Sequence, residues 1–240
     1  YLVNSKYQQI LLADPDLPDP EFFNFYGIIF DLPLAFIETF FDLKSSKFYF
    51  EIRHLFIFLI FFISSIYFLK ILKNRFDNNY VIFLGLFFYI FSPRIFGDSF
   101  YNNKDILFLS ILTISISYLF ELFEKRNNKN LILFCFFAAL ATSTRIMGVF
   151  LPLMLFVFYF LEYLINKFST RIFLLQSFKL FLLYIFFLYL HFPYIWELNI
   201  FNISGWFQNF FFWMDIKVLF NGDYYSIKYF PRSYLPLWIF

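Results

Sequence analysis

Leu55-Phe-Ile-Phe-Leu-Ile-Phe-Phe-Ile-Ser-Ser-Ile-Tyr-Phe-Leu-Lys-Ile-Leu72 is a continuous apolar stretch, and it decides the fold. A helix needs about 20 mostly apolar residues to cross the hydrocarbon core of a bilayer. The only charge in the stretch is Lys70, which lies near one end, where a long side chain can reach the headgroups. Barrel strands instead alternate apolar and polar residues. The stretch therefore predicts a transmembrane α-helix.

Five further stretches continue the pattern, although the first and third of them are short. They are Tyr80–Phe91, Ile106–Phe123, Leu131–Ser143, Met147–Leu164 and Ile172–His191. Composition agrees, since 61% of residues are hydrophobic and only 15% are charged, against about 25% charged in soluble domains. The fold class predicted is all-α, a polytopic transmembrane helical bundle. The net charge of +2 gives no support for a nucleic-acid partner.

Domain organisation follows from these spans. We expect an exterior loop over residues 1–53, a bundle of about six helices over 54–191, a second exterior loop over 192–234, and the start of a further span at 235–240. The chain begins at Tyr1 without an initiator Met and stops inside an apolar run. We therefore expect it to be the middle of a longer protein.

Basic residues gather in the short loops after the first, third and fifth spans. These are Lys70, Lys73, Arg75, Lys125, Arg126, Lys129, Lys167 and Arg171. Short cytoplasmic loops carry such an excess of Lys and Arg. The sequence thus predicts an integral, multi-pass membrane protein with its long acidic loops on the periplasmic or exterior side.

A helix lying on the membrane is predicted in the first exterior loop. Asp31-Leu-Pro33 is typical of a helix start, with Asp as the cap and Pro in the first turn. Asp31, Glu38 and Asp42 share one face of this helix, while its other sides are apolar. This pattern indicates an interfacial amphipathic helix.

Polar residues concentrate in the loop between the second and third spans. They are Arg94, Asp98, Asn102, Asn103, Lys104 and Asp105. Ionisable groups at membrane depth are costly and indicate function by default. Two cations, two carboxylates and two amides suit a ligand with a phosphate and hydroxyl groups. A solvated connecting loop with internal ion pairs is the alternative interpretation.

Two other exterior places are candidates. Arg145 interrupts the apolar sequence at Ala141-Thr-Ser-Thr-Arg-Ile-Met-Gly148, where it would bind an anionic headgroup or only snorkel. The aromatic residues of His191-Phe-Pro-Tyr-Ile-Trp196 are first of all interface anchors, and they could also stack on a sugar ring.

Metal binding receives little support. Asp14-Pro-Asp16 has the Asp-x-Asp spacing of metal-dependent sugar transferases, but the prolines around it make a poor clamp. His54 and His191 are far apart in the sequence, so no metal ligands are assigned.

The loop Ser92-Pro-Arg-Ile-Phe-Gly-Asp-Ser-Phe-Tyr-Asn-Asn-Lys-Asp105 resembles bacterial membrane glycosyltransferases of family 39. These are relatives of the dolichyl-phosphate-mannose protein mannosyltransferases, in the GT-C superfamily. Members often read Ser-Pro-Arg, two residues, Gly-His, then Asn-Pro-Lys-Asp at this place. Shorter matches are Phe25-Tyr-Gly27, Glu51-Ile-Arg-His54, Ala141–Gly148 and Pro193-Tyr-Ile-Trp196.

The resemblance implies a GT-C-like fold, a location in a bacterial inner membrane and an inverting, mannosyltransferase-like transfer. The donor would be a sugar on a polyprenyl-phosphate carrier, and the acceptor a glycan, lipid or protein at the exterior face. Arg94, Lys104 and Arg145 would bind the donor phosphate, Asn102 and Asn103 the substrate, and membrane lipids would surround the bundle. Asp105, with Asp98, would orient the acceptor or support the base. No cofactor is implied.

The chain departs from the family pattern at two positions. Asp98 stands where members more often have His, and Asn103 where they often have Pro. The family's leading acidic pair follows a span that this chain lacks, so the catalytic base is expected upstream of Tyr1.

Two other classes remain open. One is a transporter or flippase for a lipid-linked or anionic solute, which needs polar groups near the membrane midplane, and only Lys179 is expected there. The other is a purely structural subunit, which would leave the polar loop unexplained.

Overall fold

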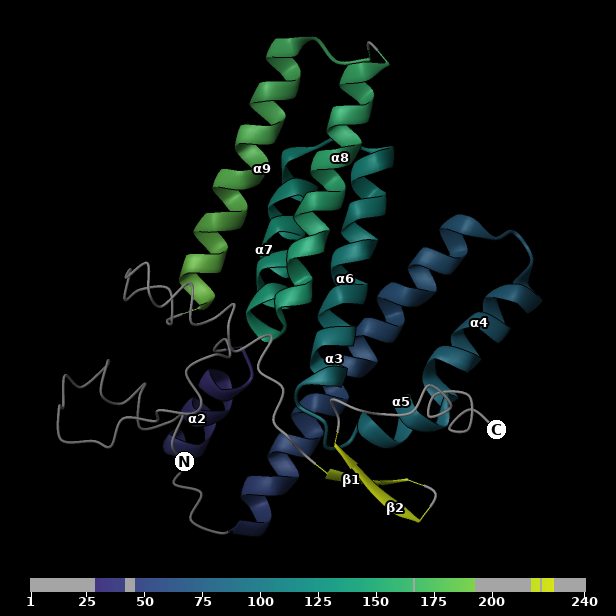
Figure 1. The fold of residues 1–240 in the computed structure, drawn as a ribbon, viewed down its shortest axis with the longest axis vertical. Helices are drawn as coiled ribbons and strands as arrows, with labels where there is room; N and C mark the ends of the chain where they lie inside the picture. Colours follow the sequence, from purple (N-terminus) through teal and green to yellow (C-terminus); the bar gives the residue numbers. More distant parts are fainter. Residues whose placement is uncertain (1–28, 42–45, 166, 193–216, 221, 227–240) are drawn as a thin grey trace, which may run out of the picture. The chain divides into compact units, whose positions relative to one another are not determined.

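The computed structural model describes residues 29–41, 46–165, 167–192, 217–220 and 222–226, and the chain has two compact units. Residues 1–197 form the first unit, whose described part is helical (Figure 1). Its elements are α2 (Asp31–Phe40), α3 (Ser46–Arg75), α4 (Asn79–Phe91), α5 (Pro93–Asp98), α6 (Asp105–Glu124), α7 (Asn128–Thr144), the 3₁₀ helix η1 (Ile146–Val149), α8 (Phe150–Leu164) and α9 (Thr170–His191). A helix occupies each of the six stretches for which the sequence predicted a span.

Four of the described helical segments are long and apolar enough to cross a membrane. They are Lys47–Arg75, Asp105–Glu124, Ile146–Leu164 and Thr170–His191. Helix α4 has 13 residues and α7 has 17, so both are shorter than these four, as the short apolar stretches of the sequence indicated. At 1.5 Å per residue, α4 is about 20 Å long against a hydrocarbon core of about 30 Å. The all-α membrane fold is therefore confirmed, and the number of full spans stays a prediction.

Local signals set the ends of several helices. The side chain of Asn78 accepts from the backbone N–H of Tyr80 at the start of α4, and that of Asn127 accepts from Asn130 at the start of α7. Helix α4 ends at Phe91, and Pro93 begins α5 one residue after Ser92, because a residue before proline is disfavoured in the α conformation. The polar loop of the sequence thus begins at a break imposed by proline.

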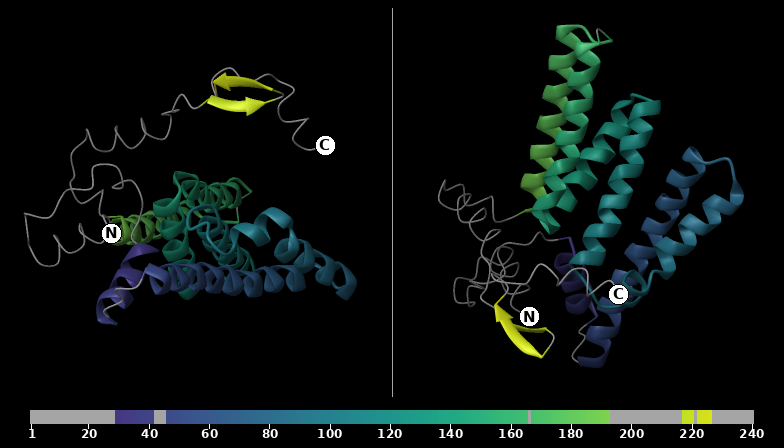
Figure 2. Two further views of the ribbon diagram at one scale, coloured as in Figure 1. Left: turned by 90° about the horizontal axis from the view of Figure 1, so that it is seen from below. Right: turned by 45° about the vertical axis from the view of Figure 1, so that its right-hand side comes forward.

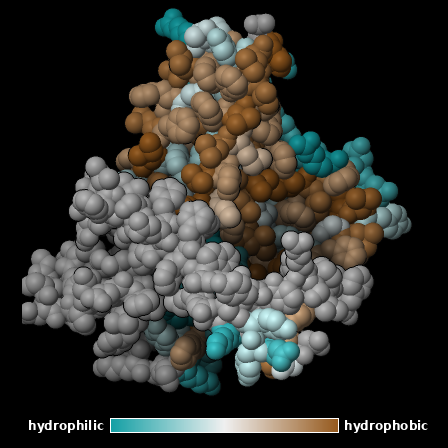
Figure 3. Space-filling model, viewed as in Figure 1, coloured by the Kyte–Doolittle hydropathy of each residue, from teal (hydrophilic) through white to brown (hydrophobic). Residues whose placement is uncertain are grey.

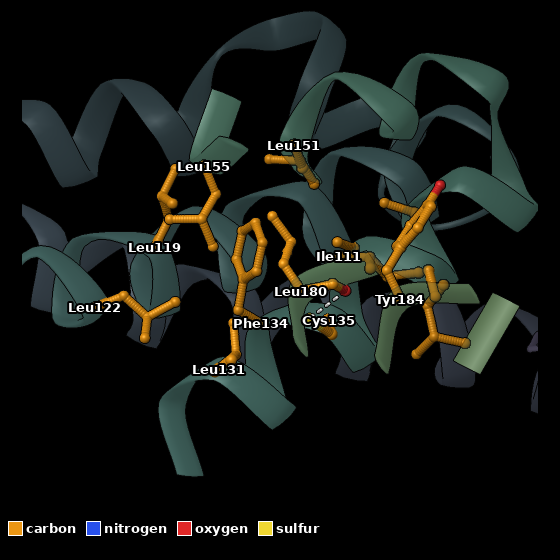
Figure 4. Close-up of a cluster of buried hydrophobic side chains, with 14 of the residues drawn as sticks. Ile111, Leu119, Leu122, Leu131, Phe134, Cys135, Leu151, Leu155, Leu180 and Tyr184 are labelled. Atoms are coloured by element: carbon orange, nitrogen blue, oxygen red, sulfur yellow. Dashed lines mark hydrogen bonds between the residues drawn. The ribbon is translucent and has the colours of Figure 1, made fainter. Parts of the chain in front are cut away.

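The long helices are arranged as successive antiparallel pairs, α3 with α4, α6 with α7 and α8 with α9 (Figure 2). Helix α7 packs extensively on both α6 and α9 and forms the centre of the core. Phe134 is fully buried there, close to Leu119, Leu155 and Leu180 (Figure 4). Small residues let the neighbouring helices approach α7 closely; they are Ala138, Ala139 and Ala141.

Hydroxyl groups inside the bundle bond to one another across helices. The hydroxyl of Tyr89 on α4 lies 3.0 Å from Ser64 Oγ on α3 and 3.2 Å from Thr113 Oγ1 on α6. Tyr184 on α9 donates to Thr142 Oγ1 on α7 at 2.9 Å. Such bonds satisfy polar groups where lipid offers no partner, and they fix the relative positions of the helices.

The outer surface of the helices is largely apolar. Figure 3 shows hydrophobic residues over much of the visible sides of the bundle, with hydrophilic residues gathered near the turns. On α9, large side chains such as Phe178 and Ile185 are about 60% exposed. Exposed apolar faces of this extent fit contact with lipid.

The second unit contains a β-hairpin that the sequence did not predict. Strands β1 (Lys217–Phe220) and β2 (Asp223–Ser226) pair antiparallel, with Phe220 opposite Asp223. Gly222 in the turn has φ +92°, a conformation that glycine adopts at little cost. Most of the predicted loop 192–234 lies outside the described residues.

Candidate active site

The polar loop between α4 and α6 is held against α3 by aromatic packing. Phe100 stacks on Phe58 of α3 at 5.4 Å between ring centroids, and Phe96 contacts Phe100 edge-on at 5.3 Å. The side chain of Ser99 is buried and donates to the carbonyl of Phe96 at 2.7 Å. These contacts fix the backbone of the loop while its charged groups reach the surface.

Asp98 lies at the centre of the loop's hydrogen bonds. Its Oδ2 accepts from Arg94 Nε at 3.0 Å and from Asn102 Nδ2 at 3.4 Å, and its Oδ1 accepts from Tyr101 OH at 2.8 Å. These donors hold the pKa of Asp98 below that of an ordinary carboxyl group, with Tyr101 contributing most and Arg94 next. The same carboxylate raises the pKa of the Tyr101 phenol. Asp98 is therefore a firmly ionised, nearly buried anchor.

Asn102 links the two carboxylates of the loop. Its amide nitrogen donates to Asp98 and also to Asp105 Oδ2 at 3.2 Å. Its side-chain oxygen accepts from the backbone N–H groups of Lys104 and Asp105 at 3.2 and 2.9 Å. Asn102 thereby fixes the turn that begins α6 and places Asp105 at its start.

Arg145 joins this network from another helix. Its Nη2 donates to Asp105 Oδ1 in an ion pair that connects the end of α7 to the start of α6. Arg145 itself is extended, with φ −146° and ψ 132°, between the last residue of α7 and η1. Sequence reasoning treated Arg145 and the polar loop as separate candidates, and the structure brings them together.

Gly148 explains how the chain can turn at Arg145. A Cβ atom built on Gly148 would lie 2.3 Å from the backbone nitrogen of Thr142 and 2.5 Å from the carbonyl carbon of Ala141. Any larger residue would push η1 away from α7. The Gly at the end of the Ala141–Gly148 match is thus a steric requirement for the position of Arg145.

The predicted site residues lie close together, and five of them are joined by side-chain contacts. Arg94, Asp98, Asn102, Asp105 and Arg145 form the continuous network described above. The backbone of Lys104 takes part, and its side chain and that of Asn103 are half-buried. The alternative interpretation was a solvated connecting loop with internal ion pairs, and the pair between Arg94 and Asp98 is of that kind. The pair between Asp105 and Arg145 is not internal to the loop, because Arg145 follows a different helix.

A second charged cluster was missed by sequence reasoning. Arg53 of α3 donates from Nε to Glu38 at 3.0 Å and from Nη1 to Asp31 at 3.2 Å, and its guanidinium lies 4.3 Å from the ring centroid of Tyr49. Helix α2 was predicted correctly, but its acidic face contacts α3 through Arg53. The sequence signal that could have indicated this cluster is the spacing of Asp31 and Glu38, seven positions apart, followed by Arg53 just before the first predicted span. Asp42 lies outside the described residues.

The described residues hold no group of three or more His, Cys, Asp and Glu side chains that could bind a metal ion. The His191 ring packs against aromatic neighbours, with 5.0 Å between its centroid and that of Phe136. Asp14-Pro-Asp16 and Pro193–Trp196 lie outside the described part of the chain.

Comparison with known families decides the identity of the bundle. The family model described as dolichyl-phosphate-mannose-protein mannosyltransferase matches residues 33–196. The chain belongs to this family. Neither the search of curated proteins nor the search of solved structures gave a match. The range matched to the mannosyltransferase family contains every residue that the sequence predicted for the site, and membership makes the chain a membrane glycosyltransferase of the mannosyltransferase type.

Substituting Gly148 tests whether close packing positions Arg145. Gly148→Ala should lower the stability of the protein by about 1–3 kcal/mol, because the added methyl group overlaps the backbone of α7. The matched control is Gly97→Ala in α5, where a Cβ would meet nothing within 4 Å. Thermal unfolding in detergent measures both variants. If Gly148→Ala were as stable as Gly97→Ala, η1 would not need to pack closely against α7.

Changing Tyr101 tests the ionisation of Asp98. The pKa of Asp98 is lowered in the folded state, so its charge stabilises the loop above the unfolded pKa, and this contribution is lost as the pH falls through the folded value. Tyr101→Phe removes the largest cause of the shift, so the variant should be less stable than wild type at neutral pH and should lose less further stability as the pH falls. Thermal unfolding between about pH 3 and pH 7 measures the effect. The exposed Tyr80→Phe should follow the wild-type profile, and an unchanged profile for Tyr101→Phe would contradict the assignment.

Proposed function

We propose that this protein transfers a mannose-type sugar from a polyprenyl-phosphate carrier to an acceptor at the exterior membrane face, with inversion. The hydroxyl oxygen of the acceptor would attack the anomeric carbon while the bond to the phosphate oxygen breaks. The polyprenyl phosphate would leave as an anion. The acceptor proton would pass to a general base other than Asp98 and Asp105.

The observation that carries this proposal is the continuous network from Arg94 through Asp98, Asn102 and Asp105 to Arg145. It gathers fixed cations and carboxylates at the junction of three helices, α5, α6 and α7. Fixed donors aimed at developing negative charge are a large source of catalytic stabilisation. Membership of a mannosyltransferase family supports transfer rather than transport.

The two carboxylates are suited to different tasks. Asp98 accepts from three side chains and has a lowered pKa, so it is a poor proton acceptor and a good anchor for Arg94. The side chain of Asp105 is 55% exposed, and its contacts are with Arg145 and Asn102. We therefore assign to Asp105 the orientation of the acceptor hydroxyl, and to Asp98 the positioning of the loop.

The cations are placed to meet the donor phosphate. Arg94 engages Asp98 through Nε, and its side chain is 75% exposed, so its Nη groups can donate to a second acceptor. Arg145 engages Asp105 through Nη2, and a guanidinium has five N–H donors in all. Both arginines can therefore hold their carboxylates and contribute donors to phosphate oxygens. Lys104 is assigned as the third phosphate-binding residue.

The position of the network favours the exterior side. Helix α6 begins at Asp105 and ends at Glu124, so the site and the basic turn after α6 are separated by the length of the helix, about 30 Å. Basic turns favour the cytoplasmic side. The isoprenoid tail of the donor would then lie along the exposed apolar faces of the helices, and no cofactor is assigned.

Two substitutions in the full-length protein test the proposal. Lys104→Ala and Asp105→Asn should each abolish transfer, because one removes a phosphate-binding cation and the other the carboxylate that orients the acceptor. The assay follows the transfer of radiolabelled sugar out of polyprenyl-phosphate mannose, with release of polyprenyl phosphate, in membranes that supply the endogenous acceptor.

Matched controls lie at the same end of the bundle. Lys47→Ala and Glu51→Gln make comparable changes in an exposed pair on α3, with 3.8 Å between Lys47 Nζ and Glu51 Oε1. These controls should retain wild-type release and membrane insertion. Wild-type rates in both Lys104→Ala and Asp105→Asn would show that the loop is not the site.

A further inference from the structure

We propose that the α6–α7 and α8–α9 turns together form a binding surface for the headgroup of an anionic phospholipid. This surface lies at the opposite end of α6 from the candidate active site and is independent of the proposed transfer reaction. Its four cations are Lys125, Lys129, Lys167 and Arg171.

An ion pair between a half-exposed arginine and a buried glutamate joins the two turns. Arg126, in the turn after α6, donates from Nη2 to Glu162 Oε1 near the end of α8. The Glu162 side chain is only 5% exposed, and the Arg126 guanidinium lies 4.8 Å from the ring centroid of Phe168 in the α8–α9 turn. The backbone N–H groups of Lys167 and Phe168 also donate to the Glu162 carbonyl, at 2.9 and 3.2 Å. The basic residues of the two turns are therefore held beside one another by a fixed contact.

The four cations have no carboxylate partner within the described ranges. Lys125, Lys129, Lys167 and Arg171 are all exposed and form no ion pair there. At the other end of the bundle, by contrast, Lys47, Arg53, Arg94 and Arg145 are each paired with a carboxylate. With Glu124 as the exposed acidic residue of these turns, the surface has an excess of positive charge that would attract an anionic partner.

The residues next to the cations indicate a lipid as that partner. Ile165 is 60% exposed two positions before Lys167, and Leu174 is 59% exposed one turn below Arg171. Ile132 is exposed close to Lys129 in α7. A phosphate bound by the cations would thus continue directly into an apolar surface. A phospholipid matches both parts, whereas an acidic peptide would match the charges alone.

The test measures lipid binding to the full-length purified protein by native mass spectrometry. Phosphatidylglycerol is compared with the zwitterionic phosphatidylcholine of the same acyl composition. Each basic residue near an anionic lipid surface contributes about a fivefold gain in affinity. Lys129→Gln with Lys167→Gln should therefore weaken phosphatidylglycerol binding about twenty-five-fold. Lys125→Gln with Arg171→Gln provides an independent second pair and should weaken it similarly.

The control removes the same amount of charge elsewhere. Lys47→Gln with Lys217→Gln changes two exposed lysines outside the turns and should leave phosphatidylglycerol binding within about twofold of wild type. If the control and the turn variants lost equal affinity for phosphatidylglycerol, the effect would depend only on net charge, and the proposal would be overturned. Equal wild-type affinity for the two lipids would overturn it as well. So would displacement of the lipid by inorganic phosphate at matched concentration, since the site would then recognise a free anion.

Discussion

Inside a bilayer no water is available to hydrogen-bond a peptide group, and this constraint shapes every part of the bundle. The apolar runs form helices because a helix satisfies its own backbone. Side-chain hydroxyls that enter the bundle find one another, as Tyr89 does with Ser64 and Thr113. Most charged groups lie near the two ends of the helices, and Lys179 in the middle of α9 is an exception. The same constraint explains why the polar loop lies before α6 and a basic turn lies after it. The two charged regions are therefore separated by the length of α6.

The candidate site depends on how closely the helices approach at one of these ends. The small residues of α7 and Gly148 bring η1 against α7, and this turn presents Arg145 to Asp105 at the start of α6. Pro93 breaks the chain after α4, and Asn102 then fixes the turn into α6. The network thus joins residues 40 positions apart in the sequence through backbone geometry rather than through any local motif. Asp98, with its lowered pKa, makes the loop a rigid support for the groups that would meet substrate.

Much of the fold was predictable, because apolar runs and capping residues act locally. Every predicted span is a helix, and Asp31 does begin α2. The loop from Arg94 to Asp105 stood out because charge beside apolar runs is costly. The partnership of Arg145 with Asp105, the role of Tyr101 and the cluster around Arg53 depend on which helix faces meet, and no periodicity in one segment specifies that. The hairpin at Lys217–Ser226 was missed because a four-residue strand leaves little pattern to recognise.

The location of the donor phosphate tests the central claim most directly. A cryo-electron microscopy structure of the full-length protein with a non-reactive polyprenyl-phosphate mannose analogue would show it. The account predicts that phosphate oxygens lie within hydrogen-bonding distance of Arg94 or Arg145, with the sugar beside Asp105. A phosphate bound at the basic turns, or anywhere away from the loop between α4 and α6, would contradict the account.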